Sequence, residues 1–441
     1  MLVAWAGLVG CSNLELDPAP TVIHARFDPD AGIVPMPTDV LRDKSLGRLN
    51  LPNDTDKELA KLNDAEREFY TYLETLDGWS SLMSATVEFT GEIDPSSIEG
   101  DNLQVWHWTG TPERVTDVRV TLSSDAKLVT IDPPRTGWRR GDQYAVVLRG
   151  GATGAAGKLG EKVECDAAFY FLRQTERLDT PEHDRAIPGD TREERIANTL
   201  RLEGIRKDLA PMFDFFETRQ LPRKDVAALW QFTVTTRTEL AMDKASQRMP
   251  LPINLMLSPQ TGKVDVPLAP WDSPVEAEAK PRLAEFDGFG LSSAQLFEFT
   301  APVDPATINT STVKLYQLGG AQPELVPSTI ELLDDRMHVV VRPVEGRLLE
   351  KTSYVIGLSP SIRDATQQPI VLMPAGHFLR ANASMLQDGA SKIHAVDLDS
   401  AQRIEGARTL LAPALDAVGR DATLAAWPFT TMEIKAPLAS A

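Results

Sequence analysis

The sequence contains two copies of the same series of motifs. A Glu-Phe-Thr element followed by Asp-Pro occupies residues 88–95 and returns at 298–305, a shift of 210 residues. An Asp-Gly-aromatic element at 77–79 returns at 287–289 with the same shift. Self-similarity over such a long period indicates two structural units of one kind. The two units take up nearly the whole sequence, so no segment is left for a separate enzymatic domain.

Further matches show where the copies differ in loop length. The Pro-x-Pro element at 35–39 aligns with 250–254, a shift of 215, and residues 201–211 align with 403–413, a shift of 202. A Trp-x-Phe-Thr element at 230–233 aligns with 427–430 after a shift of 197. Because all landmarks occur in the same order, the drift in register marks insertions and deletions between shared elements.

The middle of each copy predicts β-structure. Short alternating runs rich in Val, Thr and aromatic residues are separated by turn residues such as Asp-Pro and Gly-Gly, the pattern of strands. No crossover helices separate these runs, which argues against a parallel α/β sheet. Their spacing favours two tandem antiparallel sandwiches of the immunoglobulin-like (Ig-like) kind. The expected strands are ATVEF, LQVWHW, VTDVRVTL, KLVTI and QYAVVL, and then AQLFEFT, TVKLYQL, LVPSTIEL, HVVVRP and SYVIGL.

Each copy is expected to continue into a helical insert and then a closing strand. Apolar residues recur at steps of three and four in 202–216 and again in 404–418, which places them on one helix face. Pro211 and Pro413 lie at equivalent points, and an interior proline removes one helical hydrogen bond. The sequence therefore predicts a kinked helix or a helix pair in each copy. Segments 226–236 and 424–432 follow as closing strands, and Pro428 favours a sheet edge for the second.

These observations predict a mainly β chain with helical inserts. Its parts are a lipoprotein signal segment shortened at its start (1–11), a tether (12–20), a first unit (21–236, with its helical insert at about 191–220), a linker (237–249), a second unit (250–433, with its insert at about 397–420) and a tail (434–441).

Composition narrows the possible partners. The chain carries a formal net charge of −18 at pH 7, so it repels phosphate backbones and nucleic acid is not an expected partner. The same charge disfavours anionic membrane surfaces unless a covalent anchor holds the protein there. An apolar fraction of 42% is ordinary for a folded globular chain.

The N-terminal segment supplies a candidate anchor at Cys11. Residues 1–10 are uncharged, and Leu8-Val9-Gly10-Cys11 resembles the signal box of bacterial lipoproteins, in which the cysteine is lipidated. The segment departs from that family because no Lys or Arg precedes its short apolar run. Each buried acyl CH₂ contributes about 0.8 kcal/mol to membrane binding. The resemblance implies a protein held at the outer membrane, and Ser12 fits that destination.

Cys165 is the other cysteine. With Cys11 lipidated it has no disulfide partner, and we expect it to be a small buried apolar residue. No stretch after residue 11 approaches the length of apolar sequence that a membrane span needs.

Short motifs also resemble two known families. The pieces at 27–29, 35–41, 49–52 and 77–80 resemble the N-terminal non-catalytic region of virulence-factor-type bacterial extracellular lipases. Segments 88–98 and 298–308, together with the later Leu-rich and Tyr-containing runs, resemble the Ig-like domain of S-layer-type surface proteins. In those lipases an α/β-hydrolase domain follows. Here a second copy of the non-catalytic region stands in its place.

Catalytic signatures are not apparent. The nearest approach to a Gly-x-Ser-x-Gly elbow is 357–361, which ends in Ser and has a proline directly after Ser359. The histidines show no zinc-binding spacing, so neither a metal nor another cofactor is expected. They are His24, His107, His183, His338, His377 and His394. We therefore expect no enzyme. The alternative is an accessory or divergent member of a lipase or esterase system, in which Ser359 would have to meet a histidine.

Several other residues could have either a structural or a functional role. Asp94 and Asp304 precede prolines and are expected to form turns rather than a catalytic carboxylate pair. His107 is expected to be the solvent-facing residue between Trp106 and Trp108. The loop residues Asp28, Asp30, Asn53, Asp54 and Asp56 are weak calcium candidates, because EF-hand spacing is missing.

The matched aromatic residues are expected to fill core positions rather than to form a glycan platform. They are Trp79, Phe289, Trp230 and Trp427. The Trp-Arg-Arg run at 138–140 has no counterpart in the second copy and is expected to be a surface turn. Taken together, the sequence predicts a non-catalytic, lipid-anchored envelope protein that binds, scaffolds or adheres. Its expected partner is an envelope protein or a glycan. The residues that recognise it are expected in loops, as is usual on such folds.

Overall fold

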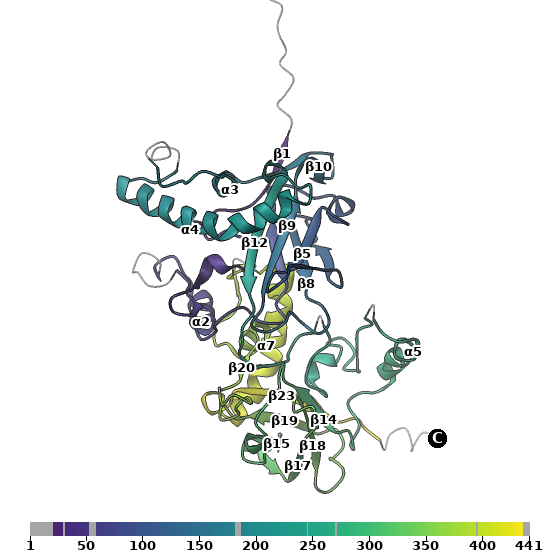
Figure 1. The fold of residues 1–441 in the computed structure, drawn as a ribbon. Coiled ribbons are helices and arrows are strands. Elements are labelled where there is room, and N and C mark those ends of the chain that lie inside the picture. Colours follow the sequence, from purple (N-terminus) through teal and green to yellow (C-terminus); the bar gives the residue numbers. More distant parts are fainter. Residues whose placement is uncertain are drawn as a thin grey trace, which may run out of the picture.

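The computed structural model describes residues 21–29, 31–52, 59–180, 187–244, 246–269, 271–393 and 396–434. Cys11, the signal segment and the tether lie outside this part of the chain. The described part is rich in β-structure, arranged as several small sheets with helices against them (Figure 1). Within it, no helix is both long and apolar enough to cross a membrane.

Each copy contains a three-stranded antiparallel sheet. In the first copy its order is β4-β8-β7, and in the second it is β14-β18-β17. The strands are β4 (Ala85–Glu88), β7 (Arg119–Leu122), β8 (Leu128–Asp132), β14 (Gln295–Glu298), β17 (Ser328–Leu332) and β18 (His338–Pro343). The pairing of Ala85 with Ile131 recurs as Gln295 with Val341, so the shift of 210 residues holds in the pairing register.

Each copy also contains a four-stranded antiparallel sheet. Its order is β12-β9-β5-β6 in the first copy and β23-β19-β15-β16 in the second. The strands are β5 (Leu103–His107), β6 (Glu113–Val115), β9 (Gln143–Arg149), β12 (Val226–Thr233), β15 (Val313–Gln317), β16 (Glu324–Val326), β19 (Ser353–Leu358) and β23 (Ala425–Thr430). The expected closing strands are β12 and β23, and Pro428 lies in the edge strand β23. The predicted runs therefore lie in antiparallel strands, but VTDVRVTL and LVPSTIEL, each expected as one strand, divide between two strands of different sheets, β6 and β7 in the first copy and β16 and β17 in the second.

The two sheets of a copy share one core because their inward residues alternate along each strand. In the first copy Val87 and Val129 of one sheet are buried in the same apolar cluster as Val146 and Phe232 of the other. In the second copy Val339 and Ile356 meet in the same way.

A long helix follows the sheets in each copy, packed against a short one. The short helices are α3 (Ala167–Leu172) and α6 (Pro374–Arg380), and the long ones are α4 (Arg192–Glu217) and α7 (Leu398–Val418). Each long helix runs through its proline as one element, so the expectation of a helix pair was wrong. Leu209, Met212 and Phe213 are buried around Pro211. Their packing outweighs the loss of one backbone hydrogen bond.

Each copy begins with a strand that belongs to a parallel pair. The sequence periodicity did not reveal these pairs. β1 (Val22–Ala25) pairs with β11 (Lys162–Cys165), and β13 (Glu239–Leu240) pairs with β20 (Val371–Leu372). β13 lies within 237–249, the segment expected to be a linker. Both of its residues are buried. Pairing of the second copy thus starts before residue 250.

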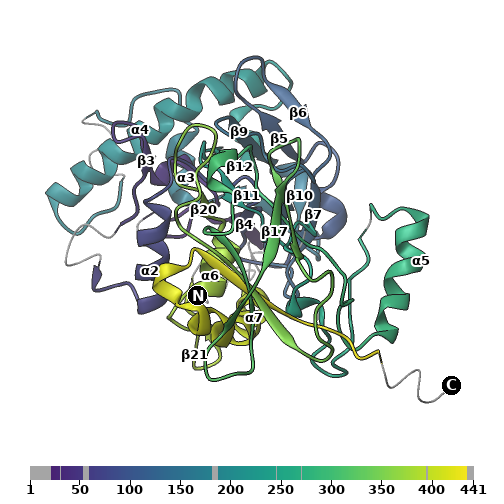
Figure 2. The ribbon, with the colours of Figure 1, turned by 90° about the horizontal axis from the view of Figure 1, so that it is seen from below.

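Like α3 and α6, which lie outside the predicted inserts, two other short helices were not predicted: α2 (Asp64–Leu73) and α5 (Pro274–Arg282). They occupy equivalent positions, since each begins with a capping box, at Asn63 and at Ser273. Helix α2 buries Ala65, Phe69 and Leu73, whereas α5 buries no residue. In both ribbon views α5 stands away from the rest of the molecule (Figures 1 and 2).

The remaining elements are short. They are η1 (Asp39–Leu41), β2 (Arg42–Asp43), β3 (Arg48–Leu49), η2 (Pro95–Ile98), β10 (Gly151–Ala156), η3 (Arg223–Asp225), η4 (Asn254–Met256), η5 (Leu283–Glu285), η6 (Pro305–Thr307), β21 (Leu386–Gln387), β22 (Ala390–Ser391) and η7 (Arg420–Ala422).

The two copies pack directly against each other. The apolar core of the first copy includes Phe378, Met385 and Ile393 of the second. Arg140 of the first copy donates hydrogen bonds to the backbone carbonyls of Thr236 and Arg237, where the chain passes into the second. Buried contacts of this kind fix the copies relative to each other, which a flexible linker would not do.

Candidate functional site

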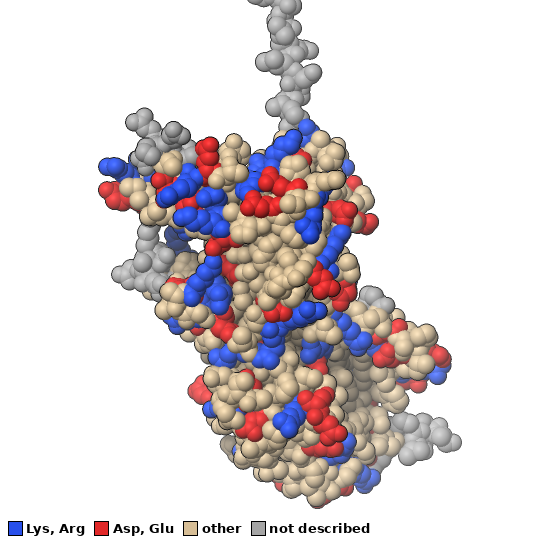
Figure 3. All heavy atoms as spheres, viewed as in Figure 1, with Lys and Arg blue, Asp and Glu red and all other residues tan. Residues whose placement is uncertain are grey.

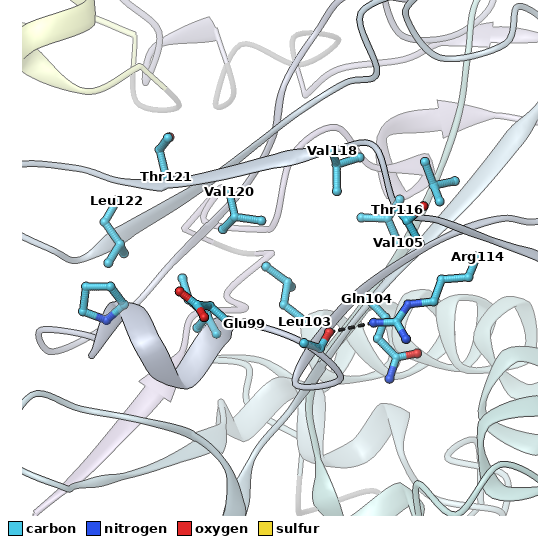
Figure 4. Close-up of a pocket in the computed structure, with 14 residues that line it drawn as sticks. Glu99, Leu103, Gln104, Val105, Arg114, Thr116, Val118, Val120, Thr121 and Leu122 are labelled. Atoms are coloured by element: carbon cyan, nitrogen blue, oxygen red, sulfur yellow. Dashed lines mark hydrogen bonds between the residues drawn. The ribbon is translucent and has the colours of Figure 1, made fainter. Parts of the chain in front are cut away.

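An apolar cleft opens between the two sheets of the first copy (Figure 4). Its volume is about 600 Å³, within the usual range of ligand sites. It lies where β6 and β7 form the free edges of their sheets, because β6 pairs only with β5 and β7 only with β8. The lining residues are Pro95, Ile98, Glu99, Gly100, Leu103, Gln104, Val105, Arg114, Val115, Thr116, Val118, Val120, Thr121 and Leu122.

Strand alternation places the apolar side chains of the cleft. Leu103 and Val105 alternate with Gln104 on β5 and are buried on the inward face. Val118, Val120 and Leu122 point from the opposite wall toward them (Figure 4). Val120 keeps 36% of its surface exposed although it faces this interior. A valine left open between two sheets is apolar area that a ligand could cover.

A single arginine organises the polar rim. Arg114 on β6 donates to the Gly100 carbonyl at 2.6 Å and pairs with Asp101 at 2.5 Å, which ties β6 to the loop after η2. Glu99 is the carboxylate among the lining residues, and none of them is a histidine, cysteine or serine. The site can thus hold an apolar ligand and offer backbone hydrogen bonds from two strand edges.

The structure places His107 differently from the sequence prediction. Its side chain is only 12% exposed and lies 2.7 Å from the Asp142 carboxylate. The neighbouring Trp106 and Trp108 contact Phe215 of α4 instead. The expectation that His107 faces solvent was wrong. His107 shares a face of β5 with the buried Leu103 and Val105 and packs on Tyr144, while helix α4 covers the opposite face, which carries the two tryptophans.

The predicted surface turn at 138–140 holds for Arg139, which is exposed, but not for Trp138. Trp138 is 2% exposed, packs on Tyr144 and Phe232, and donates from its indole nitrogen to the Met83 carbonyl at 2.8 Å. Leu348 occupies the matching position of the second copy and is also buried. The prediction failed for Trp138 because the turn folds over the open end of the core.

Other sequence predictions are confirmed. Asp94 and Asp304 each accept a backbone hydrogen bond two residues on, at 3.0 Å, and so begin turns. Trp79, Trp230 and Trp427 are at most 2% exposed, and Phe289 packs against the second core.

Cys165 is buried, and its burial raises the pKa of the thiol. Ser359 makes contacts only along its own turn and with Thr312: its hydroxyl accepts from the backbone nitrogen of Ser361, and its backbone nitrogen donates to the Thr312 carbonyl.

The calcium candidates are only partly described. The Asp28 carboxylate accepts from the backbone nitrogen of Ala31, an ordinary turn contact. Asp30, Asn53, Asp54 and Asp56 lie outside the described residues, as do Cys11, His183 and His394. Within the described ranges, no group of three or more His, Cys, Asp or Glu side chains is placed to hold a metal ion.

Buried charged residues escaped the sequence analysis. Glu203 and Arg206 on α4 form two hydrogen bonds, at 2.7 and 2.8 Å, and Glu405 and Arg408 repeat the pair on α7. Hydrogen bonding to the arginines lowers the pKa of each glutamate to about 2. The matched segments 201–211 and 403–413 contained the signal, since Glu is followed three residues later by Arg in both.

Glu239 was missed for a different reason. It is fully buried at the junction of the copies, accepts from the Ser81 backbone and hydroxyl at 2.9 and 2.8 Å, and its other oxygen has no partner. Burial raises the pKa of this carboxyl. It belongs to the segment that looked like a linker, so no local pattern marked it.

Comparisons with known proteins add little. No protein-family model matches the chain, and no curated protein matches it. The crystal structure of the S-layer protein rSbsC(31-844) aligns at 15% identity over 25% of this chain and 17% of that one, with a TM-score of 0.16. A structure of surface layer protein SbsC, domains 1-6, aligns at 13% identity over 46% and 26%, with a TM-score of 0.17. The chain thus spans well under a third of those proteins, and such scores support no functional argument.

Proposed function

We propose that this chain is a non-catalytic binding and scaffolding protein of the cell envelope, built from two Ig-like units. Its first unit takes an extended apolar segment of a partner protein into the cleft between β6 and β7. The observation that carries the proposal is the coincidence of an apolar cleft of about 600 Å³ with two free strand edges.

The strand order supports the Ig-like assignment. If β4 is taken as strand B, the sheets β4-β8-β7 and β12-β9-β5-β6 follow the order B-E-D and G-F-C-C′ of that fold. The hydroxyl of Tyr144 on β9 accepts from the Arg139 backbone nitrogen at 2.8 Å, and Tyr354 on β19 does the same with Leu349 at 3.0 Å. Both resemble the tyrosine corner of Ig domains, where the ring anchors the turn before strand F.

The chemistry of the cleft selects the occupant. Valine and leucine on both walls favour apolar side chains, and the free edges favour a backbone with unpaired N–H and C=O groups. An extended peptide satisfies both requirements at once, since alternate side chains enter the cleft while its backbone adds to a sheet edge. The face seen in Figure 3 mixes charges of both signs over both copies, so that face has no single-sign patch that would favour a strongly charged ligand.

A peptide library tests this function. Peptides selected for binding to the full chain should alternate apolar and polar residues, and Val120→Lys should abolish their binding because it places a charge inside the cleft. Leu325→Lys is the control, since Leu325 is 55% exposed on β16, the counterpart in the second copy of the edge strand β6. Binding that survives Val120→Lys, or selects charged peptides, contradicts the proposal.

The membrane attachment is proposed from Cys11 alone. A chain with a net charge of −18 needs a covalent hold to remain at an anionic surface. Intact mass of protein extracted from membranes should show acyl chains at Cys11, and Cys11→Ser should release the protein from the membrane fraction. Unmodified protein of full length in that fraction would refute the anchor and leave the cleft proposal untouched.

A further inference from the structure

The interface between the two copies is built around one helix. Helix α2 of the first copy lies on α6 of the second, where the Phe69 and Phe378 rings are 4.5 Å apart and Tyr72 stacks on His377 at 4.3 Å. Glu68 closes the end of this contact by accepting from the backbone nitrogens just after α6, those of Asn382 and Ala383, at 3.2 and 3.1 Å. The interface thus has two different surfaces: a helix side, formed by α2 of the first copy, and a receiving side, formed by α6 of the second.

The duplication supplies a second copy of each side. On the helix side, α5 is the counterpart of α2, and Glu278 falls where Glu68 lies, 210 residues later. On the receiving side, α3 is the counterpart of α6. The sequence fixes this match, because Phe171-Leu172-Arg173 returns as Phe378-Leu379-Arg380, 207 residues on. The arginines agree with it, since Arg206 donates to the Gln174 and Thr175 carbonyls and Arg408 to the Ala381 carbonyl. The same shift places Tyr170 and Phe171 where His377 and Phe378 lie.

None of the described residues covers either counterpart as α2 and α6 cover each other. No residue of α5 is buried, and the face matching the buried face of α2 shows Val275 76% exposed and Leu283 37% exposed. Tyr170 on α3 is 52% exposed beside a hollow of about 590 Å³. Phe171 of α3 and Leu202 of α4 line that hollow, and their counterparts in the second copy, Phe378 and Ile404, pack in the core that α2 completes.

We propose that copies of this chain associate head to tail, with α5 of one chain in the α3–α4 hollow of the next. This inference goes beyond the proposed peptide binding and uses other surfaces. Helix α3 lies at the upper end of the molecule and α5 projects from the side of its lower half (Figure 1), so one chain cannot join its own two faces. A contact between two different surfaces that does not close into a ring builds an open chain of molecules.

The side chains set the strength of this contact. Ala279 and Arg282 stand on α5 where α2 has Phe69 and Tyr72, so the contact buries less apolar surface than the internal one. Arg282 and Tyr170 then meet where Tyr72 and His377 stack, which replaces an aromatic pair by a cation over a ring. The association is therefore weaker than the internal interface and depends on protein concentration.

Sedimentation of the full chain over a wide concentration range, in reducing buffer, tests the proposal. The average mass should rise beyond that of a dimer without a plateau. Val275→Asp blocks the helix face and Tyr170→Asp blocks the hollow, so each variant alone should remain monomeric. Both positions are exposed, and unchanged melting temperatures would verify that both variants fold. Leu325→Asp, an exposed leucine on β16, should associate like the unaltered chain.

Mixing the two blocked variants gives the sharpest result. Each retains one intact face, so an equimolar mixture should form a one-to-one dimer and nothing larger. A protein that stays monomeric at every concentration, a dimer that does not grow, or a mixture that stays monomeric would each overturn the proposal. None of these outcomes affects peptide binding in the cleft, which Val120→Lys examines separately.

Discussion

The Tyr72 ring of the first copy stacks on the His377 ring of the second at 4.3 Å, and its hydroxyl donates to the Leu372 carbonyl at 2.5 Å. Helix α2 is therefore bound to the second copy by a stacked ring pair and a hydrogen bond together. This contact encloses His377, whose Nε2 has no hydrogen-bond partner among the described residues. The protonation state of His377 is therefore linked to the packing of the two copies against each other.

Mild acid should weaken the molecule through His377. Burial, and then the nearby Arg380, lowers the pKa of His377 from 6.5 to about 4. The unfolded chain binds this proton as pH falls below 6.5 while the folded chain does not, so stability is complete above 6.5 and declines between 6.5 and about 4. We expect a loss of about 2 kcal/mol, reduced because the ring is partly exposed. Urea melts at several pH values measure it.

His377→Phe is the matched variant, since it preserves ring stacking with Tyr72 and removes the titration. Its stability should not decline as pH falls from 6.5 to about 4, because the raised pKa of Glu239 acts in the opposite direction and the pKa values of Glu203 and Glu405 are about 2. An equal decline in the variant and the unaltered chain would show that another group is responsible.

Phe378→Ala should uncouple the two copies. The ring is 5% exposed and packs on Phe69, so its removal leaves a cavity and costs about 3–5 kcal/mol. Unfolding followed by tryptophan fluorescence should change from one transition to two, because the two cores then melt apart. Phe171→Ala is the control at the equivalent position, where no helix of the chain lies on top, and it should cost less and leave a single transition.

The buried ion pairs should differ from surface pairs in their contribution to stability. The Glu203 and Arg206 side chains are 3% and 9% exposed, and without Arg206 the buried carboxylate retains Lys207 at 3.5 Å and the Leu178 backbone N–H at 3.0 Å. Arg206→Ala should therefore cost about 3 kcal/mol. Arg408→Ala should cost somewhat less, since its pair is 15–17% exposed. Arg342→Ala breaks a pair that is more than half exposed and should change stability by under about 1 kcal/mol. Chemical denaturation at pH 7 ranks the three.

These pairs also set the response to strong acid. The pKa of both Glu203 and Glu405 falls from 4.5 to about 2, so the stability they provide is present above 4.5 and is lost as pH falls toward 2. This interval lies below that of His377. Two successive losses in one acid titration are therefore expected, and only the second should disappear in a chain carrying both Arg206→Ala and Arg408→Ala.

Local periodicity predicted the elements whose burial repeats along the chain. β5 alternates buried Leu103 and Val105 with Gln104, and α4 buries residues at helical steps, so both were visible in the sequence. Helix α5 carries a charged residue at every second position from 276 to 282 and buries none of its residues, and β13 has only two residues, so neither shows the period of its own element. The duplication implies α5 and β13 only when their counterparts in the first copy, α2 and β1, are known from the structure.

The candidate cleft could not be predicted in the same way. It depends on which strands end at the sheet edges, and that is decided by the pairing order rather than by any run of residues. Trp138 shows the same limit, because nothing in the Trp-Arg-Arg run reveals that its turn folds back over the core. Sequence analysis correctly assigned Asp94, Trp79 and Cys165, where the local chemistry alone decides the role.

Glu239 should make the junction more stable when it cannot ionise. Burial raises the pKa of this carboxyl above 4.5, so the folded chain retains a proton that the unfolded chain has lost, and stability declines as pH rises from 4.5 through the raised pKa. Glu239→Gln preserves an acceptor for Ser81 and never ionises. It should therefore exceed the unaltered chain in stability at pH 7 and match it below pH 4.5. Glu239→Ala leaves the Ser81 backbone N–H and hydroxyl buried without an acceptor and should cost about 1–3 kcal/mol at both pH values. If Glu239→Gln were instead as damaging as Glu239→Ala at pH 7, the carboxylate would have to be charged in the folded chain, with Arg140 as its counter-ion, and the junction would depend on an ion pair rather than on a neutral acid.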